Sequence, residues 1–290
     1  MAKKLEKEKK YDSMQSCCFL HYMERRGIML PLILLLIVFF LFIGIMLLVK
    51  MYQQANENTV KYELIYFPQF PRSFQEISLF FISDIHRRVV ADSIIAEVKD
   101  TAEIVVIGGD LTEKGVSFDQ VKQNIQKLKL IGPVYFVWGN NDYEVDTDRL
   151  KRIFAEEKVT VLDNQSITFT SEAGEKWSLV GIEDYSMELD ELEHALEQTR
   201  EDVFKLLLSH NPKIMEKVKQ EHKISLVLSG HTHGGQIRIF GIGPYEIGKT
   251  KIMGETTLLV SNGYGTTKFP LRLGAKPETH LIKIKNTQDQ

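Results

Sequence analysis

The stretch "ISLVLSGHTHGGQ", Ile224 to Gln236, begins as a run of branched apolar residues and ends in two histidines set among glycines. A short run of this kind, closed by glycine, is typical of a β-strand buried on both faces. In extended backbone residues i and i+2 point the same way, so His231 and His233 can present their imidazoles as a pair. The stretch predicts a buried strand that delivers two histidines at its carboxyl end.

Four other short apolar runs repeat this pattern. They are "ISLFFIS" (77–83), "EIVVIGG" (103–109), "PVYFVWG" (133–139) and "FKLLLSH" (204–210). Amphipathic stretches of helical period lie between the runs, at 91–100, 117–130, 147–157, 188–199 and 212–220. Further strand-like runs occupy 166–170, 177–182, 235–240, 256–261 and 280–285. Strands that alternate with helices predict an α/β fold.

Polar residues follow each of the five buried runs, in the blocks "SDIH", "GGDLTEKG", "GNND", "SHNP" and "GHTHGG". Ligands of open α/β sheets bind outside the carboxyl ends of the strands, so these segments deliver their side chains to one rim. The candidate metal ligands are Asp84, His86, Asp110, Asn140, His210, His231 and His233. One block alone reads as well as a turn or helix cap, whereas five in order favour a metal centre.

The chemistry of this set limits the metals that it suits. Carboxylate and imidazole without sulfur suit Mn, Fe, Zn or Co better than Ca or Mg, which prefer oxygen alone. The two cysteines, Cys17 and Cys18, are adjacent and lie far from the five blocks in sequence. Seven donors are too many for one tetrahedral ion and fit two ions that share a bridging carboxylate.

One segment, Gly27 to Val49, is apolar throughout and carries no charge. As a helix it spans roughly 30 Å, the thickness of a hydrocarbon core, and it is longer than the apolar part of a cleaved signal peptide. Seven Lys and Arg residues precede it, and only Lys50 and Lys61 follow closely. The positive-inside rule therefore predicts a cytoplasmic N-terminus. The expected layout is a cytoplasmic segment 1–26, a transmembrane anchor 27–49, a polar tether 50–75 and an extracytoplasmic domain 76–290.

Taken together, the five blocks resemble the signature of calcineurin-like metallophosphoesterases. The closing "SNGYGTTKFPLRLGAKPETHLIKI" (261–284) and the N-terminal anchor resemble the membrane-associated bacterial YkuE-type branch. The resemblance covers roughly residues 75–285. It implies a four-layer αββα sandwich, preceded here by one transmembrane helix, with a dinuclear metal site at its rim.

The resemblance also implies a role for each ligand. Asp84, His86 and His233 would bind the first ion, whereas Asn140, His210 and His231 would bind the second, with Asp110 as the bridge. A hydroxide held between the ions would be the nucleophile, because paired metals lower the pKa of bound water. The ions would also neutralise charge that develops on the phosphoryl oxygens.

Asn141 stands where many members of this family have histidine after "GN". An amide donates a hydrogen bond but delivers no proton at neutral pH, and general-acid help is typically worth about 10²–10⁴-fold in rate. We therefore expect diesters, pyrophosphate-type bonds or aryl-like leaving groups to be favoured over alkyl monoesters. Asp142 is expected to orient a ligand of the site.

Candidate substrate contacts are fewer. Arg87 and Arg88 follow His86 directly, and arginine grips phosphate oxygens well, although exposed loop arginines are an equal alternative. Lys268 and Arg272 are weaker candidates. Tyr264 and Phe269 are expected either as an apolar lip for a lipid-bearing substrate or as core.

The sequence thus predicts a membrane-anchored, metal-dependent phosphoesterase acting on a phosphodiester, phosphomonoester or pyrophosphate, with a lipid-linked substrate as one option. The alternatives are an inactive metal-binding scaffold at the membrane surface and a surface nucleotidase. A net charge of −3 provides no basic footprint, so no nucleic-acid polymer is expected as a partner.

Overall fold

A computed structural model describes residues 2–289 except 201, with side chains described for 29–288 except 201. The chain divides into two compact units, Met1–Lys50 and Met51–Gln290, and each is described by itself. The first unit is formed by a single helix, α1 (Ala2–Ala55). The last five residues of this helix, 51–55, belong to the second unit. Within it Met29–Ala55 has a hydropathy of 3.5 and is long and apolar enough to cross a membrane.

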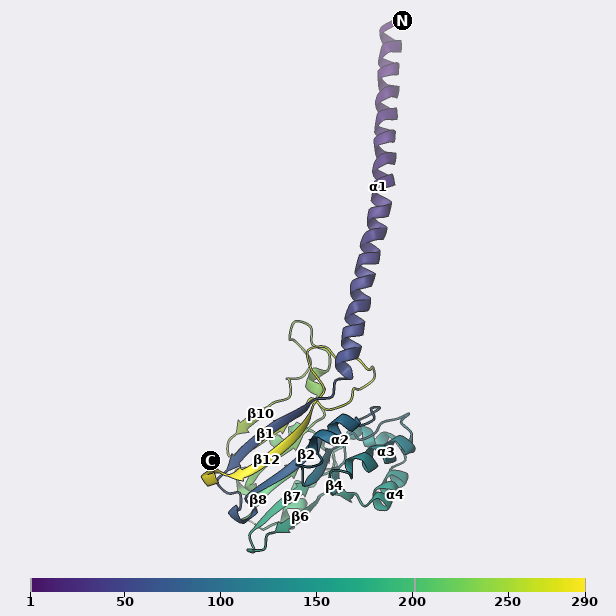
Figure 1. Cartoon of the computed structure of the whole chain (residues 1–290). Helices are drawn as coiled ribbons and strands as arrows, with labels where there is room; N and C mark the ends of the chain where they lie inside the picture. Colours follow the sequence, from purple (N-terminus) through teal and green to yellow (C-terminus); the bar gives the residue numbers. More distant parts are fainter. Residues whose placement is uncertain (1, 201, 290) are drawn as a thin grey trace. The chain divides into compact units, whose positions relative to one another are not determined.

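Two six-stranded sheets make up the second unit (Figure 1). In spatial order the first sheet holds β1 (Val60–Phe67), β12 (Thr279–Asn286), β2 (Glu76–Ile82), β3 (Ile104–Gly108), β4 (Val134–Val137) and β5 (Thr160–Val161). The second holds β10 (Thr250–Met253), β11 (Thr256–Val260), β9 (Ile224–Ser229), β8 (Phe204–Leu208), β7 (Lys176–Gly181) and β6 (Gln165–Thr170). The strands that precede the five polar blocks run parallel within each sheet.

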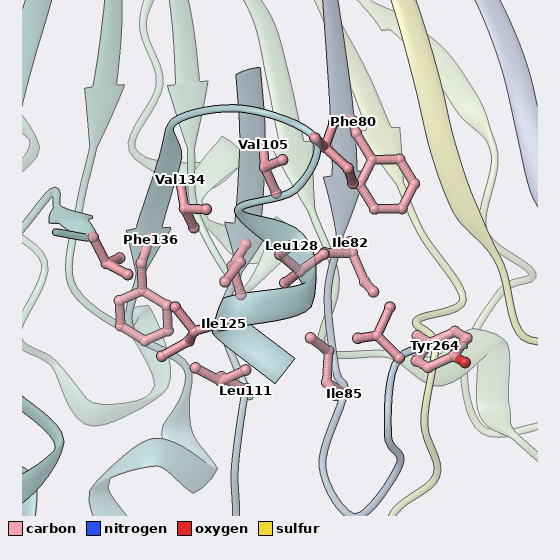
Figure 2. Packing of buried hydrophobic residues seen from close by; sticks show 14 of the residues in the cluster. Phe80, Ile82, Ile85, Val105, Leu111, Ile125, Leu128, Val134, Phe136 and Tyr264 are labelled. Carbon is pink, nitrogen blue, oxygen red and sulfur yellow. The ribbon is translucent and has the colours of Figure 1, made fainter. Parts of the chain in front are cut away.

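Alternate side chains of the central strands face different layers. In β2, Leu79 and Phe81 pack in the cluster between the two sheets, together with Leu206 and Leu228. Phe80 and Ile82 point the other way, toward the helices that cover the first sheet, as Figure 2 shows. Burial on both faces explains why these runs are continuously apolar.

Helices complete the outer layers. The first sheet is covered by α2 (Asp92–Val98), α3 (Phe118–Leu128) and α4 (Thr147–Glu157). On the second sheet, α5 (Leu192–Glu197) and a 3₁₀ helix, η4 (Pro212–Glu216), pack Leu192, Ala195 and Ile214 against the strands. The predicted four-layer αββα sandwich is thereby confirmed.

Three segments differ from the sequence-based expectation. Residues 50–75 are no tether, because they contain β1, which pairs in parallel with β12 from Val60 opposite Thr279. Its alternating polar side chains suit an edge strand that is half exposed. The stretch 212–220 forms only the short η4 rather than an α-helix. Residues 235–240 form a loop with isolated bridges instead of a strand, since Gly235, Gln236 and Phe240 have left-handed φ.

Candidate metal centre

Backbone hydrogen bonds join the loops that carry the candidate ligands. The Asp84 N–H donates to Gly109 O (3.0 Å) and the His86 N–H donates to Asp110 O (3.1 Å), which fixes the loops after β2 and β3 together. The two sheets are then linked by the N–H of His231, which donates to the Asp84 carboxylate at 3.0 and 3.2 Å. Segments far apart in the sequence thus converge on one rim.

Five of the seven candidate ligands adopt left-handed backbone conformations. Asp84, His86, Asp110, His231 and His233 have φ between 50° and 67°. A non-glycine residue in this region costs on the order of 1–3 kcal/mol, and such residues cluster at functional sites. The strain turns each side chain out of its strand direction and toward the rim.

Glycine is needed where these loops approach one another. A Cβ at Gly139 would lie 2.3 Å from Asp110 Oδ1 and 2.4 Å from its backbone nitrogen. At Gly230 a Cβ would lie 2.3 Å from Asp84 Oδ2. The glycines of "GNND" and "GHTHGG" therefore leave the space that the two carboxylates occupy.

Asp84, His86 and His233 form the first group of donors. His233 Nε2 lies 3.3 Å from Asp84 Oδ1 and 3.1 Å from His86 Nε2. All three residues are buried, and their donor atoms lie within 4.8 Å of one another. This is the trio that the sequence assigns to the first ion.

A second group adjoins the first through Asp110, whose Oδ2 lies 3.7 Å from His86 Nε2 and 3.2 Å from His210 Nε2. His231 Nδ1 lies 3.2 Å from His210 Nε2. The buried Oδ1 of Asn140 has no hydrogen-bond partner among the described residues. Buried polar atoms are normally paired, so an orphaned oxygen on a residue that lines one cavity with Asp110 and His231 fits a metal ligand. Donor atoms of Asp84, Asp110 and His210 also lie within 4.8 Å of one another, so the two groups of donors overlap at Asp84.

The pKa values of the histidines at the rim depend on their burial and on the charged groups beside them. Burial favours neutral His210, but the adjacent Asp110 carboxylate raises the pKa of His210 well above its usual value. Burial, with His86 and Arg272 nearby, holds the pKa of His233 well below its usual value. Divalent cations compete with protons for such atoms, so the ligands must shed protons when metal binds.

Residues 77–235, more than half of the chain, match the family described as calcineurin-like phosphoesterase. The chain belongs to this family. It is 44% identical over 241 residues to the uncharacterized protein YpbG of Bacillus subtilis, covering 81% of this chain and 91% of that protein. It is 26% identical over 253 residues to the uncharacterized metallophosphoesterase YkuE of the same organism (81% and 86% covered). Against the phosphodiesterase YaeI of Escherichia coli the identity is 26% over 244 residues (78% and 87% covered).

The family predicted from the five blocks is confirmed, and the chain is a metal-dependent phosphoric ester hydrolase. Family members use divalent metals, and the two donor groups described above are where this phosphoesterase offers ligands for them.

Two residues support the site in ways that the sequence does not predict: Glu113, which it does not single out, and Arg272, which it names only as a weak candidate for substrate contact. Glu113 is buried with Oε2 3.0 Å from His86 Nδ1, an arrangement that orients a metal-binding imidazole in the manner of a carboxylate–histidine pair. Arg272 is fully buried and places Nη2 3.2 Å from His233 Nδ1. Glu113 belongs to the quoted block "GGDLTEKG", and its place three residues after Asp110 is a sequence signal that it lies near the metal ligands. Arg272 lies outside the five blocks, and only the tertiary structure brings it to His233.

Asn141 and Asp142 occupy different positions beside the phosphoesterase site. The Asn141 N–H donates to Asp110 Oδ1 (2.8 Å), and its side chain contacts Asn140 and Glu144. Asp142 is buried and accepts from the N–H groups of Gly139, Asp110 and Thr112 at 2.8–3.0 Å. Its carboxylate therefore ties the "GNND" turn to the loop of Asp110.

Both arginines that follow His86 make contacts within the protein. Arg87 bonds to Glu113 and to Lys114 O. Arg88 donates to Tyr264 O (2.6 Å) and Asn58 Oδ1 (2.8 Å), and its guanidinium stacks 3.7 Å from the Tyr264 ring centre. These contacts orient both guanidinium groups, and a contact of Arg87 or Arg88 with the substrate stays a prediction. Tyr264 itself is buried core.

A cavity of about 510 Å³ opens beside the donors. Its lining includes five candidate site residues, Asp110, Asn140, Asn141, His231 and His233. The other side is formed by Ile237, Pro244, Tyr245, Lys268 and Phe269. The Gln236 amide holds the outer wall together, because it donates to Thr267 O (3.0 Å) and accepts from the Thr267 N–H (2.9 Å). A second cavity, of about 840 Å³, meets the same donors at Asn140 and His231 and is lined by polar groups that include Ser186, Asn211 and Lys213.

Proposed function

We propose that this phosphoesterase binds two divalent ions and hydrolyses phosphodiester or pyrophosphate bonds, among them those of a lipid-linked substrate. The observation that carries the proposal is the position of Asp110 Oδ2 between His86 and His210, one from each donor group. In this proposal Asp84, His86 and His233 hold one ion and Asn140, His210 and His231 hold the other. Paired ions supply a water nucleophile that is acidic enough at neutral pH, and they neutralise phosphoryl charge.

The other residues of the site orient these groups. Glu113 fixes the ring of His86, and Asp142 holds the Asp110 loop in place through three backbone N–H groups. The Asn141 amide reaches a substrate oxygen as a donor but has no proton to release to a leaving group. The enzyme should therefore work best on esters whose leaving group departs as an anion without help.

The cavities support an amphipathic substrate. The 510 Å³ cavity has an apolar outer wall, whereas most residues that line the 840 Å³ cavity carry polar groups, among them Ser186, Glu188 and Lys213. A phosphorus atom at the donors would have an apolar group on one side and a polar head group on the other. Lys213, exposed in the second cavity, would contact an anionic head group.

We also propose an orientation for the anchor. Basic residues are concentrated before the apolar segment, so the N-terminus lies in the cytoplasm and the metal centre outside it. A scaffold without turnover is disfavoured because all seven donors are retained and clustered. A nucleotidase remains the second candidate, since the polar cavity also suits a nucleoside.

The test uses the full chain in detergent, with metal content and turnover of bis(p-nitrophenyl) phosphate measured after incubation with Mn²⁺. We expect turnover that Asp110→Ala abolishes together with metal binding. Asp100→Ala, an exposed aspartate remote from the five blocks in sequence, is the matched control and should change neither. Metal binding without turnover of any phosphodiester, pyrophosphate or nucleotide would contradict the proposal and support the scaffold.

A further inference from the structure

A tight turn beyond the last metal-ligand block holds a phenylalanine in an unfavourable conformation. The N–H groups of Ile239 and Ile242 each donate to the carbonyl of the other at 3.0 Å, which leaves Phe240 and Gly241 at the tip. Both tip residues have positive φ, 51° and 81°. Turns of this kind favour Asn-Gly, and a bulky residue with positive φ is an outlier. Phenylalanine here disfavours the fold.

The Phe240 side chain is also not stabilised by burial within the protein. Phe240 is 100% exposed, and its neighbours Ile239 and Ile242 are 62% and 78% exposed. With Ile237, Tyr245 and Phe269, they form what we call the apolar rim, and these last three residues line the outer side of the 510 Å³ cavity. A contiguous exposed apolar patch beside a site marks an interaction surface.

The apolar rim is held in place from below. Arg238 donates to Gly234 O (3.0 Å) and Gly241 O (2.6 Å) and also bonds to Tyr245 O, so one guanidinium braces both ends of the loop. The hydrogen bonds of Arg238 therefore hold the exposed tip of the loop in a defined conformation.

The same loop is attached to the end of the apolar helix. Arg238 N–H donates to Leu273 O (2.7 Å). The residues on either side of Leu273, Arg272 and Gly274, donate to residues of α1. Arg272 N–H donates to Met51 O (3.0 Å), and Gly274 N–H donates to Gln54 Oε1 (3.3 Å). Met51 and Gln54 belong to the last turns of the segment Met29–Ala55 that is apolar enough to span a membrane. Within the second unit these bonds tie the loop of the apolar rim to Met51 and Gln54, which follow directly after Lys50 in the chain.

We propose that the apolar rim inserts into the surface of the lipid bilayer and that the 510 Å³ cavity receives its substrate from there. Apolar side chains flanked by a tyrosine and a lysine, here Tyr245 and Lys268, are the composition that membrane interfaces favour. Delivery of a lipid phosphoester rests on the proposed function, whereas insertion of the rim does not. The strain at Phe240 is accounted for because only an apolar tip gains free energy from the interface.

Insertion is tested by fluorescence on the full chain in nanodiscs made with or without brominated phosphatidylcholine. Both native tryptophans, Trp138 and Trp177, are buried, so a Phe240→Trp variant adds the accessible indole. We expect brominated lipid to quench the added emission by about twofold, because interfacial groups sit about 5–10 Å into the headgroup and acyl boundary. Leu130→Trp is the control, since Leu130 is 69% exposed but precedes β4 and so lies at the end of the strands opposite the donors. Equal quenching of the two variants would overturn the proposal. The apolar rim would then be assigned to a protein partner instead of the bilayer.

Delivery is tested by Phe240→Asn, which suits the turn and should leave the melting temperature unchanged or raised. We expect several-fold slower hydrolysis of a phosphodiester lipid in the nanodisc and an unchanged rate on bis(p-nitrophenyl) phosphate. Equal loss on both substrates would assign Phe240 a structural role and overturn the proposal. If the unmodified chain turned over neither substrate, the proposed function would fail, and the quenching result would still decide insertion.

Discussion

At the scale of single residues, the metal centre depends on contacts behind the ligands as much as on the ligands. Glu113 lies 3.0 Å from His86 Nδ1, which leaves His86 Nε2 turned toward Asp110 and His233. The carboxylate fixes both the ring orientation and its basicity. The consequence is that substitution of a residue that touches no ion should weaken metal binding.

Glu113→Gln should reduce the affinity for the first ion by about 10–100-fold, because loss of an outer-shell carboxylate typically has that effect. Titration of the metal-stripped full chain with Mn²⁺, followed by calorimetry, measures it. Glu172→Gln, on an exposed turn between β6 and β7, should leave the affinity unchanged. Wild-type affinity for both ions in the Glu113 variant would show that the contact has no bearing on the metals.

The amide of Asn141 is predicted to limit the rate on substrates with poor leaving groups. Asn141→His adds a group able to donate a proton, and general-acid help is worth up to about 10²–10⁴-fold. The variant should gain more on an alkyl phosphodiester than on an aryl one, because the alkoxide is the poorer leaving group. Rates on a matched alkyl and aryl pair measure this, and an equal change on both would count against the assigned role of Asn141.

At the scale of elements, the features that sequence reasoning found are those with a local cause. The five runs before the polar blocks are buried on both faces, so their apolar character is continuous and their ends are marked by Gly, Ser or Asn. The sequence does not predict strand β1, because its half-exposed edge alternates polar and apolar residues within an expected tether. It predicts a strand at 235–240 because the apolar residues there resemble one, whereas the structure exposes Ile237, Ile239 and Phe240 in a loop. Arg272 reaches His233 only through tertiary folding.

Gly139→Ala tests how closely the elements converge. A Cβ there would meet the backbone nitrogen of Asp110 at 2.4 Å, which no side-chain rotation relieves. We expect a loss of about 1–3 kcal/mol in the free energy of unfolding, as for overpacking, together with weaker Mn²⁺ binding. Gly174→Ala, where no atom lies within 4 Å but φ is +82°, separates strain from collision. It should cost stability without changing metal affinity, and a Gly139 variant that bound metal normally would refute the convergence argument.

At the scale of the whole molecule, a buried ion cluster joins the C-terminal strand to the rest of the domain. Glu278, just before β12, lies 2.5 Å from Lys61 Nζ of β1 and accepts from the Asn262 N–H (2.8 Å). Burial opposes its ionisation, but His280 and Lys61 lower the pKa of Glu278 below its usual value. A lowered pKa in the folded state gives stability above the unfolded pKa, and that stability is lost as the pH falls through the folded value.

Glu278→Gln should therefore lower the free energy of unfolding by about 1–3 kcal/mol at pH 7, the usual cost of disrupting a buried hydrogen-bonded charge. The gap from the unmodified chain should narrow as the pH falls below about 4, where the carboxylate becomes protonated. Thermal unfolding across this pH range measures it. A difference that stayed constant with pH would mean that the charge of Glu278 does not contribute.

Two ions are proposed to share Asp110, and anomalous diffraction from crystals of the full chain grown with Mn²⁺ tests this sharing most directly. We expect two peaks about 3.5–4 Å apart, as in other dinuclear sites. One should lie beside Asp84, His86 and His233, and the other beside His210 and His231, with Asp110 between them. A single peak, or two peaks with Asp110 turned away from both, would contradict it.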